Sequence, residues 1–261
     1  MPNPFKAALA RREPQIGLWL SMAQAYTTEI CATAGFHWVL IDGEHAPNDV
    51  RSTLAQLQAV AAYPVHPIAR AVDGNPARIK QLLDIGLDTI LVPMVDTPEQ
   101  ARALVAATRY PPQGMRGVGA SGARATRWGL LRDYTDSAND ETCLLVQAES
   151  VTALKNLEAI CAVDGIEGVF IGPADLAASM GYRGRLGDPE VVASIDRAIR
   201  TIQASGKAAG TLTVDPALAR HYLEVGVGFI AVGVDTVLLA QATRALAASF
   251  GAQGLARDPT R

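Results

Sequence analysis

The sequence has little of what marks secreted, membrane-spanning or nucleic-acid-binding proteins. It contains three cysteines, Cys31, Cys143 and Cys161, without CxxC spacing, which indicates free thiols in a reducing compartment. No apolar run approaches the length of a membrane span, and the opening MPNPFKAALARREP lacks the apolar core of a signal peptide. The formal net charge of -3 gives no basic field, so nucleic acid is not expected as a partner. We therefore expect a cytoplasmic protein that acts on a small molecule.

Lysine is also scarce, and its positions argue against one kind of covalent chemistry. An enzyme that forms a Schiff base with its substrate needs a lysine at the mouth of its active site. The lysines are Lys6, Lys80, Lys155 and Lys207, and none of them follows a predicted strand. The sequence lacks GxSxG as well, so hydrolysis through a serine nucleophile has no support. We expect neither a Schiff-base lysine nor a nucleotide cofactor.

What the sequence does contain is a regular alternation of short apolar runs and helical segments. The apolar runs are rich in Val, Ile and Leu and predict strands at 16–21, 38–42, 66–70, 89–95, 143–149, 168–172, 208–213 and 229–234. Several helices between them should begin with a capping residue and a proline, at Asn75-Pro76, Thr97-Pro98, Asp188-Pro189 and Asp215-Pro216. This alternation predicts an α/β fold, a single (β/α)8 barrel over residues 1–250 with a flexible tail at 251–261.

The alternation is interrupted once, by about fifty residues between the fourth and fifth predicted strands. This segment is rich in Gly and Arg and shows little helical periodicity. Loops of that length in a compact barrel usually have a function or lie at an interface.

Reactive side chains gather where the predicted strands end, which is where barrel enzymes carry their chemistry. They are Asp42, Glu44, His45, Arg70, Gln147, Glu149 and Asp175. Acids that directly follow buried apolar runs are costly unless a cation compensates them. The pattern therefore predicts a charged site at one end of the barrel.

Glu149 and Asp175 are the candidate metal ligands. Two carboxylates from adjacent strands, with water and a chelating substrate, suit Mg²⁺, Mn²⁺ or Co²⁺. The shortage of nearby histidines argues against a closed zinc site, although Zn²⁺ stays an alternative ion. A second interpretation is that Glu149 or Asp175 caps the helix that follows it, as Asp175 could do near PADLAASMG.

His45 and Arg70 are the candidate catalytic side chains. Histidine has an ordinary pKa near 6.5, so His45 could exchange a proton at neutral pH, although a lone histidine is more often structural. Arg70 could hold a keto oxygen or carboxylate and stabilise an enolate, or it could form an ion pair with a barrel acid. Backbone N–H groups at Gly172-Pro173-Ala174 could bind a carboxylate. The AVGVDT stretch at 231–236 is either a phosphate site or a tight turn.

With these residues in place, the sequence resembles the metal-dependent class II pyruvate aldolases of the 4-hydroxy-2-oxoheptanedioate aldolase family. The resemblance covers nearly the whole chain, through DGEHAPNDV, KQLLDIG, RYPPQGMRGVG, VQAES, GVFIGPADL and FIAVGVDT. It implies reversible cleavage of a 4-hydroxy-2-oxo acid to pyruvate, or a close 2-oxo acid, and an aldehyde, through a metal-bound enolate. It also implies a homohexamer, a trimer of dimers with exchanged C-terminal helices.

Carried over by position, the resemblance implies a role for each candidate. Glu149 and Asp175 would bind the metal, Arg70 would steady the enolate oxygen, His45 would move a proton through water, and Asp84 would reach His45 from a neighbouring subunit. Gln147, Gly172, Pro173, Ala174 and Asp42 would support substrate binding, and Trp19 and Leu212 would border the aldehyde.

Some features of the sequence leave the substrate open. Ala71-Val72-Asp73 after Arg70, and TLTVD at 211–215, depart from the family pattern at the end of the site that receives the aldehyde. Two other functions also stay open. One is that of a relative of the citryl and malyl-CoA lyases, which use another enolate donor, and the other is that of a barrel that binds oxo acids without catalysis.

Overall fold

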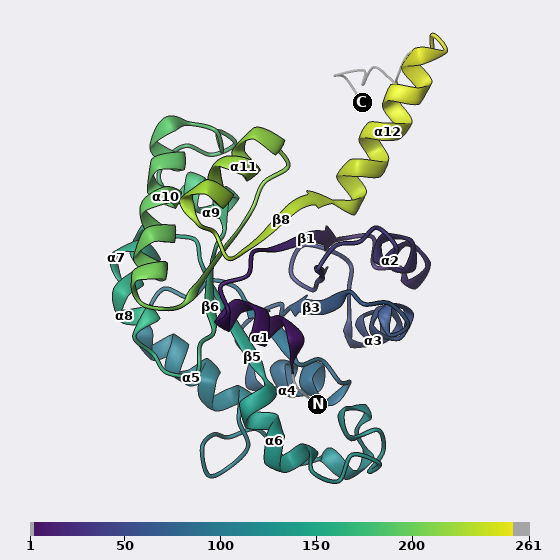
Figure 1. The fold of residues 1–261 in the computed structure, drawn as a ribbon, viewed down its shortest axis with the longest axis vertical. Coiled ribbons are helices and arrows are strands. Elements are labelled where there is room, and N and C mark those ends of the chain that lie inside the picture. The colour runs from purple at the N-terminus through teal and green to yellow at the C-terminus, as the bar shows by residue number, and fades with distance from the viewer. Residues whose placement is uncertain (1–2, 253–261) are drawn as a thin grey trace, which may run out of the picture.

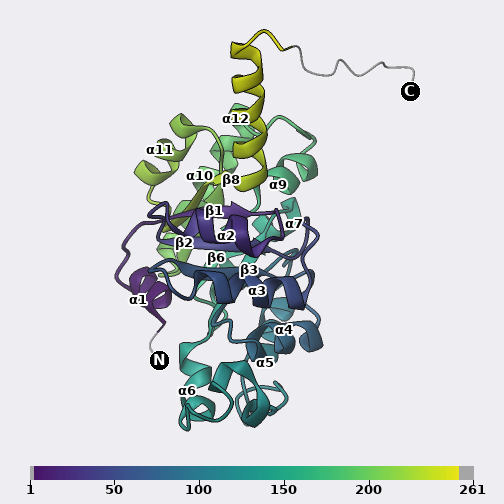
Figure 2. The same ribbon diagram turned by 90° about the vertical axis from the view of Figure 1, so that its right-hand side faces the viewer.

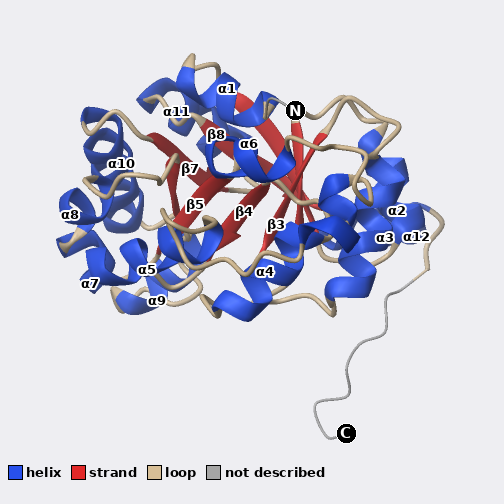
Figure 3. Ribbon diagram, turned by 90° about the horizontal axis from the view of Figure 1, so that it is seen from below, coloured by secondary structure: helices blue, strands red, loops and turns tan. Residues whose placement is uncertain are grey.

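Eight parallel strands close into a barrel in which each strand pairs with its neighbours in the sequence (Figures 1 and 3). The computed structural model describes residues 3–252. Its strands are β1 (Gln15–Leu20), β2 (Trp38–Asp42), β3 (His66–Arg70), β4 (Thr89–Val92), β5 (Cys143–Ala148), β6 (Gly168–Ile171), β7 (Ala208–Leu212) and β8 (Phe229–Val234). The predicted (β/α)8 barrel is confirmed, and each observed strand overlaps its predicted one.

Helices surround the barrel on the outside (Figure 3). They are α1 (Pro4–Ala10), α2 (Ala25–Ala32), α3 (Val50–Val60), α4 (Pro76–Asp84), α5 (Pro98–Thr108), α6 (Tyr134–Glu141), α7 (Val151–Lys155), α8 (Leu157–Cys161), α9 (Pro173–Ser179), α10 (Pro189–Ala204), α11 (Pro216–Val225) and α12 (Asp235–Ser249), with short 3-10 turns η1 (Ala120–Gly122) and η2 (Arg124–Thr126). The four predicted pairs of capping residue and proline begin α4, α5, α10 and α11.

The alternation of side chains along each strand separates two hydrophobic cores. Leu40 and Ile68 face the inside of the barrel, whereas their neighbours along the strands pack against the helices. The inward-facing set continues past the last apolar residues, so Asp42 follows Leu40 and Arg70 follows Ile68 on the same face. The register of β2 and β3 puts Asp42 beside Arg70. This periodicity brings the polar strand-end residues together above the inner core.

The opposite end of the barrel is closed by α1. Its Phe5 is buried and contacts the rings of Trp38, His66 and Phe229, which stand at the beginnings of their strands. Because His66 begins β3, it lies at this end of the barrel, away from the polar strand ends.

The long segment between β4 and β5 follows α5 and returns to the N-terminal end of β5, so it lies at the end of the barrel opposite to the charged strand ends. It includes α6, which the sequence did not indicate, because YTDSANDE buries only Ala138 and so has no apolar stripe. The segment is anchored by Arg116, whose buried side chain pairs with Asp84 at 2.8 Å. Its guanidinium also lies over the ring of Tyr110.

The last helix, α12, projects from the barrel after β8 (Figures 1 and 2). Asp235 is its only buried residue, and Leu238, Leu239 and Leu246 are exposed. None of the helices within residues 3–252 is both long and apolar enough to cross a membrane. Of the predicted tail, only residues 251 and 252 are among those described.

Candidate active site

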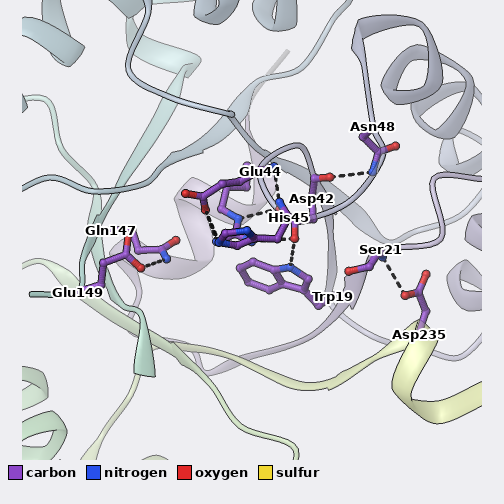
Figure 4. Close-up of polar contacts among 10 residues, drawn as sticks. Trp19, Ser21, Asp42, Glu44, His45, Asn48, Gln147, Glu149 and Asp235 are labelled. Carbon is purple, nitrogen blue, oxygen red and sulfur yellow. Dashed lines mark hydrogen bonds and ion pairs between the residues drawn. The ribbon is translucent and has the colours of Figure 1, made fainter. Parts of the chain in front are cut away.

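A cavity of about 360 Å³ opens at the carboxyl ends of the strands. It is lined by Trp19, His45, Arg70, Gln147, Glu149, Phe170, Gly172, Pro173, Ala174, Asp175, Leu186, Gly187, Leu212, Thr213, Val214, Asp215, Leu218 and Tyr222. All of the candidate residues except Asp42, Glu44 and Asp84 are in this lining. Figure 4 shows the polar contacts around it.

Arg70 lies between two acids at the floor of the cavity. Its Nε donates to Oδ1 of Asp42 at 2.8 Å and its Nη2 donates to Oδ2 at 2.7 Å, so the contact is bidentate. Its Nη1 lies 2.5 Å from Oε2 of Glu44. Trp19 donates from Nε1 to Asp42 at 3.1 Å (Figure 4). Burial alone would raise the pKa of Asp42, but the hydrogen bonds and charge of Arg70, with the bond from Trp19, outweigh it and lower that pKa.

The ion pair with barrel acids, one of the two interpretations of Arg70, is therefore present. It leaves room for a ligand, because a guanidinium carries five N–H groups and these contacts occupy three of them. The Arg70 side chain is buried, and its Cζ lies 4.9 Å from the centre of the Trp19 ring. The group is thus fixed in place with donors to spare.

His45 stands at the rim of the cavity on the turn after β2. The turn is held because Oδ1 of Asp42 accepts the backbone N–H of Glu44 at 3.0 Å and that of His45 at 3.4 Å. Asn48 also donates to the carbonyl of Asp42 at 2.8 Å (Figure 4). The His45 side chain is 66% exposed, and its Nε2 lies 3.7 Å from Oε2 of Glu44. The imidazole is therefore accessible to both water and a ligand.

Glu149 is a second buried acid of the site, with 3% of its surface exposed. Oε1 accepts the backbone N–H of Met94 at 2.8 Å, and Oε2 accepts a hydrogen bond from Nε2 of Gln147 (Figure 4). Burial outweighs these two hydrogen bonds and, with the nearby charges of Asp175 and Glu44, raises the pKa of Glu149 to about 7. A cation beside Glu149 would stabilise the ionised form of this carboxyl group.

The surroundings of Glu149 fit a divalent cation. The charge of Asp175 contributes to the raised pKa of Glu149, so the two carboxylates are electrostatically coupled. Oε1 of Gln147 is buried without a hydrogen-bond partner among residues 3–252. Oxygen donors are what Mg²⁺ and Mn²⁺ prefer. Over the same residues, no group of three or more His, Cys, Asp or Glu side chains could hold a metal ion, so water and substrate would have to complete the coordination.

The first turn of α9 is fitted against Glu149. A Cβ atom on Gly172 would lie 2.2 Å from Oε2 of Glu149, so close approach requires glycine here. Gly172 is the N-cap of α9, and no side chain caps this helix. Asp175 lies in the first turn, where the helix dipole favours a negative charge, but it is not the cap that the second interpretation expected.

Two sequence hypotheses concern residues that lie outside the cavity. Asp84 ends α4 and contacts Arg116, so within one chain it is not part of the cavity. At AVGVDT, the carboxylate of Asp235 accepts the backbone N–H groups of Ser21 at 2.8 Å, Met22 at 3.1 Å and Thr236 at 2.7 Å. Because an acid of the chain occupies this turn (Figure 4), the tight turn describes it better than the phosphate site.

Other residues of the site were missing from the sequence hypothesis. The backbone N–H of Met94 donates to Glu149, and Met94 has a φ of 58°, in the left-handed region. A backbone contact of this kind cannot be predicted from the residue type. Leu186 and Val214 reach the cavity from loops, which have no period from which to infer direction. Asn48, which directly precedes Asp49, the N-cap of α3, was the one available signal, because its short polar side chain can bind a turn.

A barrel that gathers two carboxylates, an arginine and a histidine at the carboxyl ends of its strands has the arrangement of a barrel enzyme. Residues 15–242 match the model of the HpcH/HpaI aldolase/citrate lyase family, and the chain belongs to that family. The resemblance noted in the sequence is thereby confirmed.

Similar proteins define the class further. The hydroxypyruvate/pyruvate aldolase of Cupriavidus necator is 70% identical over 96% of this chain and 93% of its own. The 4-hydroxy-2-oxo-heptane-1,7-dioate aldolase of Escherichia coli is 56% identical over 99% of each chain. The crystal structure of a family member from Burkholderia cenocepacia matches with a TM-score of 0.92 at 39% identity, over 95% of this chain and 99% of that one. This chain is accordingly an aldolase, a carbon–carbon lyase.

Proposed function

We propose that this aldolase reversibly cleaves 4-hydroxy-2-oxo acids to pyruvate, or a close 2-oxo acid, and an aldehyde. In cleavage the C3–C4 bond breaks, the 4-hydroxyl loses its proton and becomes the aldehyde carbonyl, and the electron pair passes to C3 to form the enolate of pyruvate. A proton added at C3 completes the product. The observation that carries the proposal is the buried Glu149, coupled to Asp175 at the cavity that also contains Arg70.

The metal of this reaction would be held by the carboxylates of Glu149 and Asp175. Mg²⁺, Mn²⁺ and Co²⁺ suit these oxygen donors, with Zn²⁺ as the alternative. When bound, such a cation supplies Lewis-acid stabilisation of the charge that develops on the keto oxygen. Gln147 and the backbone of Met94 each hold one oxygen of Glu149, which orients the ligand.

The other residues bind the substrate and move the proton. Arg70, held by Asp42 and Glu44, directs its remaining N–H groups to the keto oxygen of the 2-oxo acid. His45 exchanges a proton with the 4-hydroxyl, directly or through water. The uncapped first turn of α9 offers the backbone N–H of Ala174 to the substrate carboxylate.

The assembly is proposed to be a hexamer in which α12 is exchanged between subunits. The exposed apolar residues Leu238, Leu239 and Leu246 support this, because a second subunit would remove them from water. In the assembly Asp84 would approach His45 of the partner subunit. Sedimentation analysis and activity on dilution test the idea, since a fully active monomer would contradict it. A cytoplasmic location also stays a prediction, supported by the free cysteines.

Exchange of the pyruvate methyl protons in D₂O, followed by NMR, tests the function before the aldehyde is known. Chelator-treated protein would be compared with protein given Mg²⁺, Mn²⁺ or Co²⁺. We expect exchange that depends on the metal. Absence of exchange with each ion, in folded protein that binds the metal, would contradict the proposal and favour either another donor, such as a CoA thioester, or a binding role.

A further inference from the structure

Part of the cavity wall beyond the catalytic residues is formed mainly by loop and helix residues, and this part is here called the outer lobe. The lobe is formed by the loop after α9 on one side and by the end of β7 with α11 on the other. Its residues are Leu186, Gly187, Leu212, Thr213, Val214, Asp215, Leu218 and Tyr222. Leu186 is 39% exposed and Val214 is 55% exposed, so two aliphatic side chains stand uncovered at the entrance.

The lobe contains no Arg, Lys or His among the described residues that line it. Arg185 is the chain neighbour of Leu186, but its guanidinium lies 4.7 Å from the ring centre of Tyr182 and 3.6 Å from a carboxylate oxygen of Asp188. The carboxylate of Asp215 adds a negative charge to the lobe. It also caps α11 by accepting the N–H of Ala217 at 2.8 Å. Among the described residues of one chain that line the lobe, a negatively charged group would therefore meet an acid and no cation.

The remainder of the cavity does not supply the missing positive charge. Arg70 is the one Arg or Lys in the described lining, and it already contacts Asp42 and Glu44. Glu149 and Asp175 would each share their charge with the metal, and the 2-oxo acid brings a carboxylate of its own. A second carboxylate on the aldehyde would be desolvated without a partner.

From this arrangement we infer that the aldehyde partner is uncharged and carries a short aliphatic chain, which lies in the outer lobe. The inference rests on the proposed aldol reaction. In that reaction C3 of the enolate forms a bond to the aldehyde carbon, and the carbonyl oxygen takes a proton to become the 4-hydroxyl. The chain beyond the aldehyde carbon contacts Leu186, Val214 and Leu218. Each methylene buried there should raise kcat/KM about fourfold.

The test compares two aldehydes of the same shape and different charge. In 4-methylpentanal, an isopropyl group replaces the carboxylate of 4-oxobutanoate. With pyruvate and saturating Mn²⁺, kcat/KM for 4-methylpentanal should exceed that for 4-oxobutanoate by about tenfold or more, because the lobe leaves a buried charge without a partner. An equal or higher value for 4-oxobutanoate would overturn the inference.

A variant isolates the charge of the lobe as the cause. Val214→Arg adds a guanidinium at the exposed entrance without a reactive amine, and should shift the ratio of the two kcat/KM values toward 4-oxobutanoate by about tenfold. Val214→Gln adds length without charge and should leave the ratio favouring 4-methylpentanal. The inference is wrong if both variants change the ratio alike, or if neither changes it.

The proton exchange of pyruvate separates this inference from the proposed function. Exchange needs no aldehyde, so its absence contradicts the aldol proposal itself. Exchange in wild-type protein that nevertheless prefers 4-oxobutanoate contradicts only the assignment of the outer lobe.

Discussion

Replacing Gly172 with alanine should disturb the metal site by steric contact alone. The backbone at Gly172 has φ of -78° and ψ of 103°, which alanine adopts without strain. The new Cβ would lie 2.2 Å from Oε2 and 2.9 Å from Cβ of Glu149, and 2.9 Å from Nε2 of Gln147. Such contacts are too short to persist, so the carboxylate of Glu149 has to move.

The size of the effect follows from how tightly Glu149 is held. Both Glu149 and Gln147 are 3% exposed, so neither can swing into solvent. Adding a methyl group to a packed site typically costs about 1–3 kcal/mol. If this cost falls on the ligand geometry, the affinity for Mn²⁺ should drop by roughly tenfold to a hundredfold. Otherwise the free energy of unfolding should fall by the same amount.

Titration calorimetry with Mn²⁺ and urea denaturation of the metal-free protein measure the two quantities. Gly187→Ala is the matched control, because Gly187 lines the same cavity and has no atom within 4 Å of the position of its Cβ. Unchanged Mn²⁺ affinity and unchanged stability for Gly172→Ala would refute the close packing described here. Equal losses of Mn²⁺ affinity in both variants would refute the specific role of Glu149.

Three further predictions concern the charged groups. His45→Ala should lower aldol turnover by about a hundredfold or more while Mn²⁺ still binds, and full turnover of the folded variant would remove His45 from the mechanism. Asp42→Ala should lower the free energy of unfolding by about 3–5 kcal/mol, because the buried Arg70 loses its bidentate partner; urea denaturation would measure this, and a change under 1 kcal/mol would count against the pair. The pKa of Glu149 is about 7 in the metal-free folded protein and about 4.5 in the unfolded chain, so the folded state binds the proton of Glu149 more tightly. The folded state therefore loses stability as the pH rises from about 4.5 through 7. That loss, up to about 3 kcal/mol, should be absent from Glu149→Gln when both proteins are denatured in urea at pH 5 and pH 8.

The sequence predicts the barrel and the inner part of the site because both follow from the period of a strand. A strand that is buried on both faces reads as a continuous apolar run, and the residues that succeed it keep its direction. Asp42, Arg70 and Gln147 therefore lie where an inward-facing residue must lie, and the family resemblance assigns their chemistry.

Contacts between segments without a period could not be predicted in this way. The partner of Asp84 within the chain is Arg116, which lies 32 residues further along in a loop rich in glycine. The guanidinium of the buried Arg116 lies over the rings of Tyr110 and Tyr134, and no local sequence pattern predicts these contacts. The left-handed turn at Met94 is likewise set by tertiary contacts, because methionine has no preference for it.

The difference between strand residues and loop residues also separates the catalytic groups from the residues that would select the aldehyde. The groups that would bind the metal and the 2-oxo acid, such as Arg70 and Glu149, stand on or directly after strands and are buried in the barrel wall. The residues that would meet the aldehyde, such as Leu186 and Val214, stand on loops and are partly exposed. A substitution at an exposed loop residue rarely changes stability much, whereas moving a strand of the closed barrel disturbs its neighbours on both sides. Acceptor preference can therefore vary while the enolate chemistry stays fixed, so the aldehyde has to be inferred from the charge of the outer lobe.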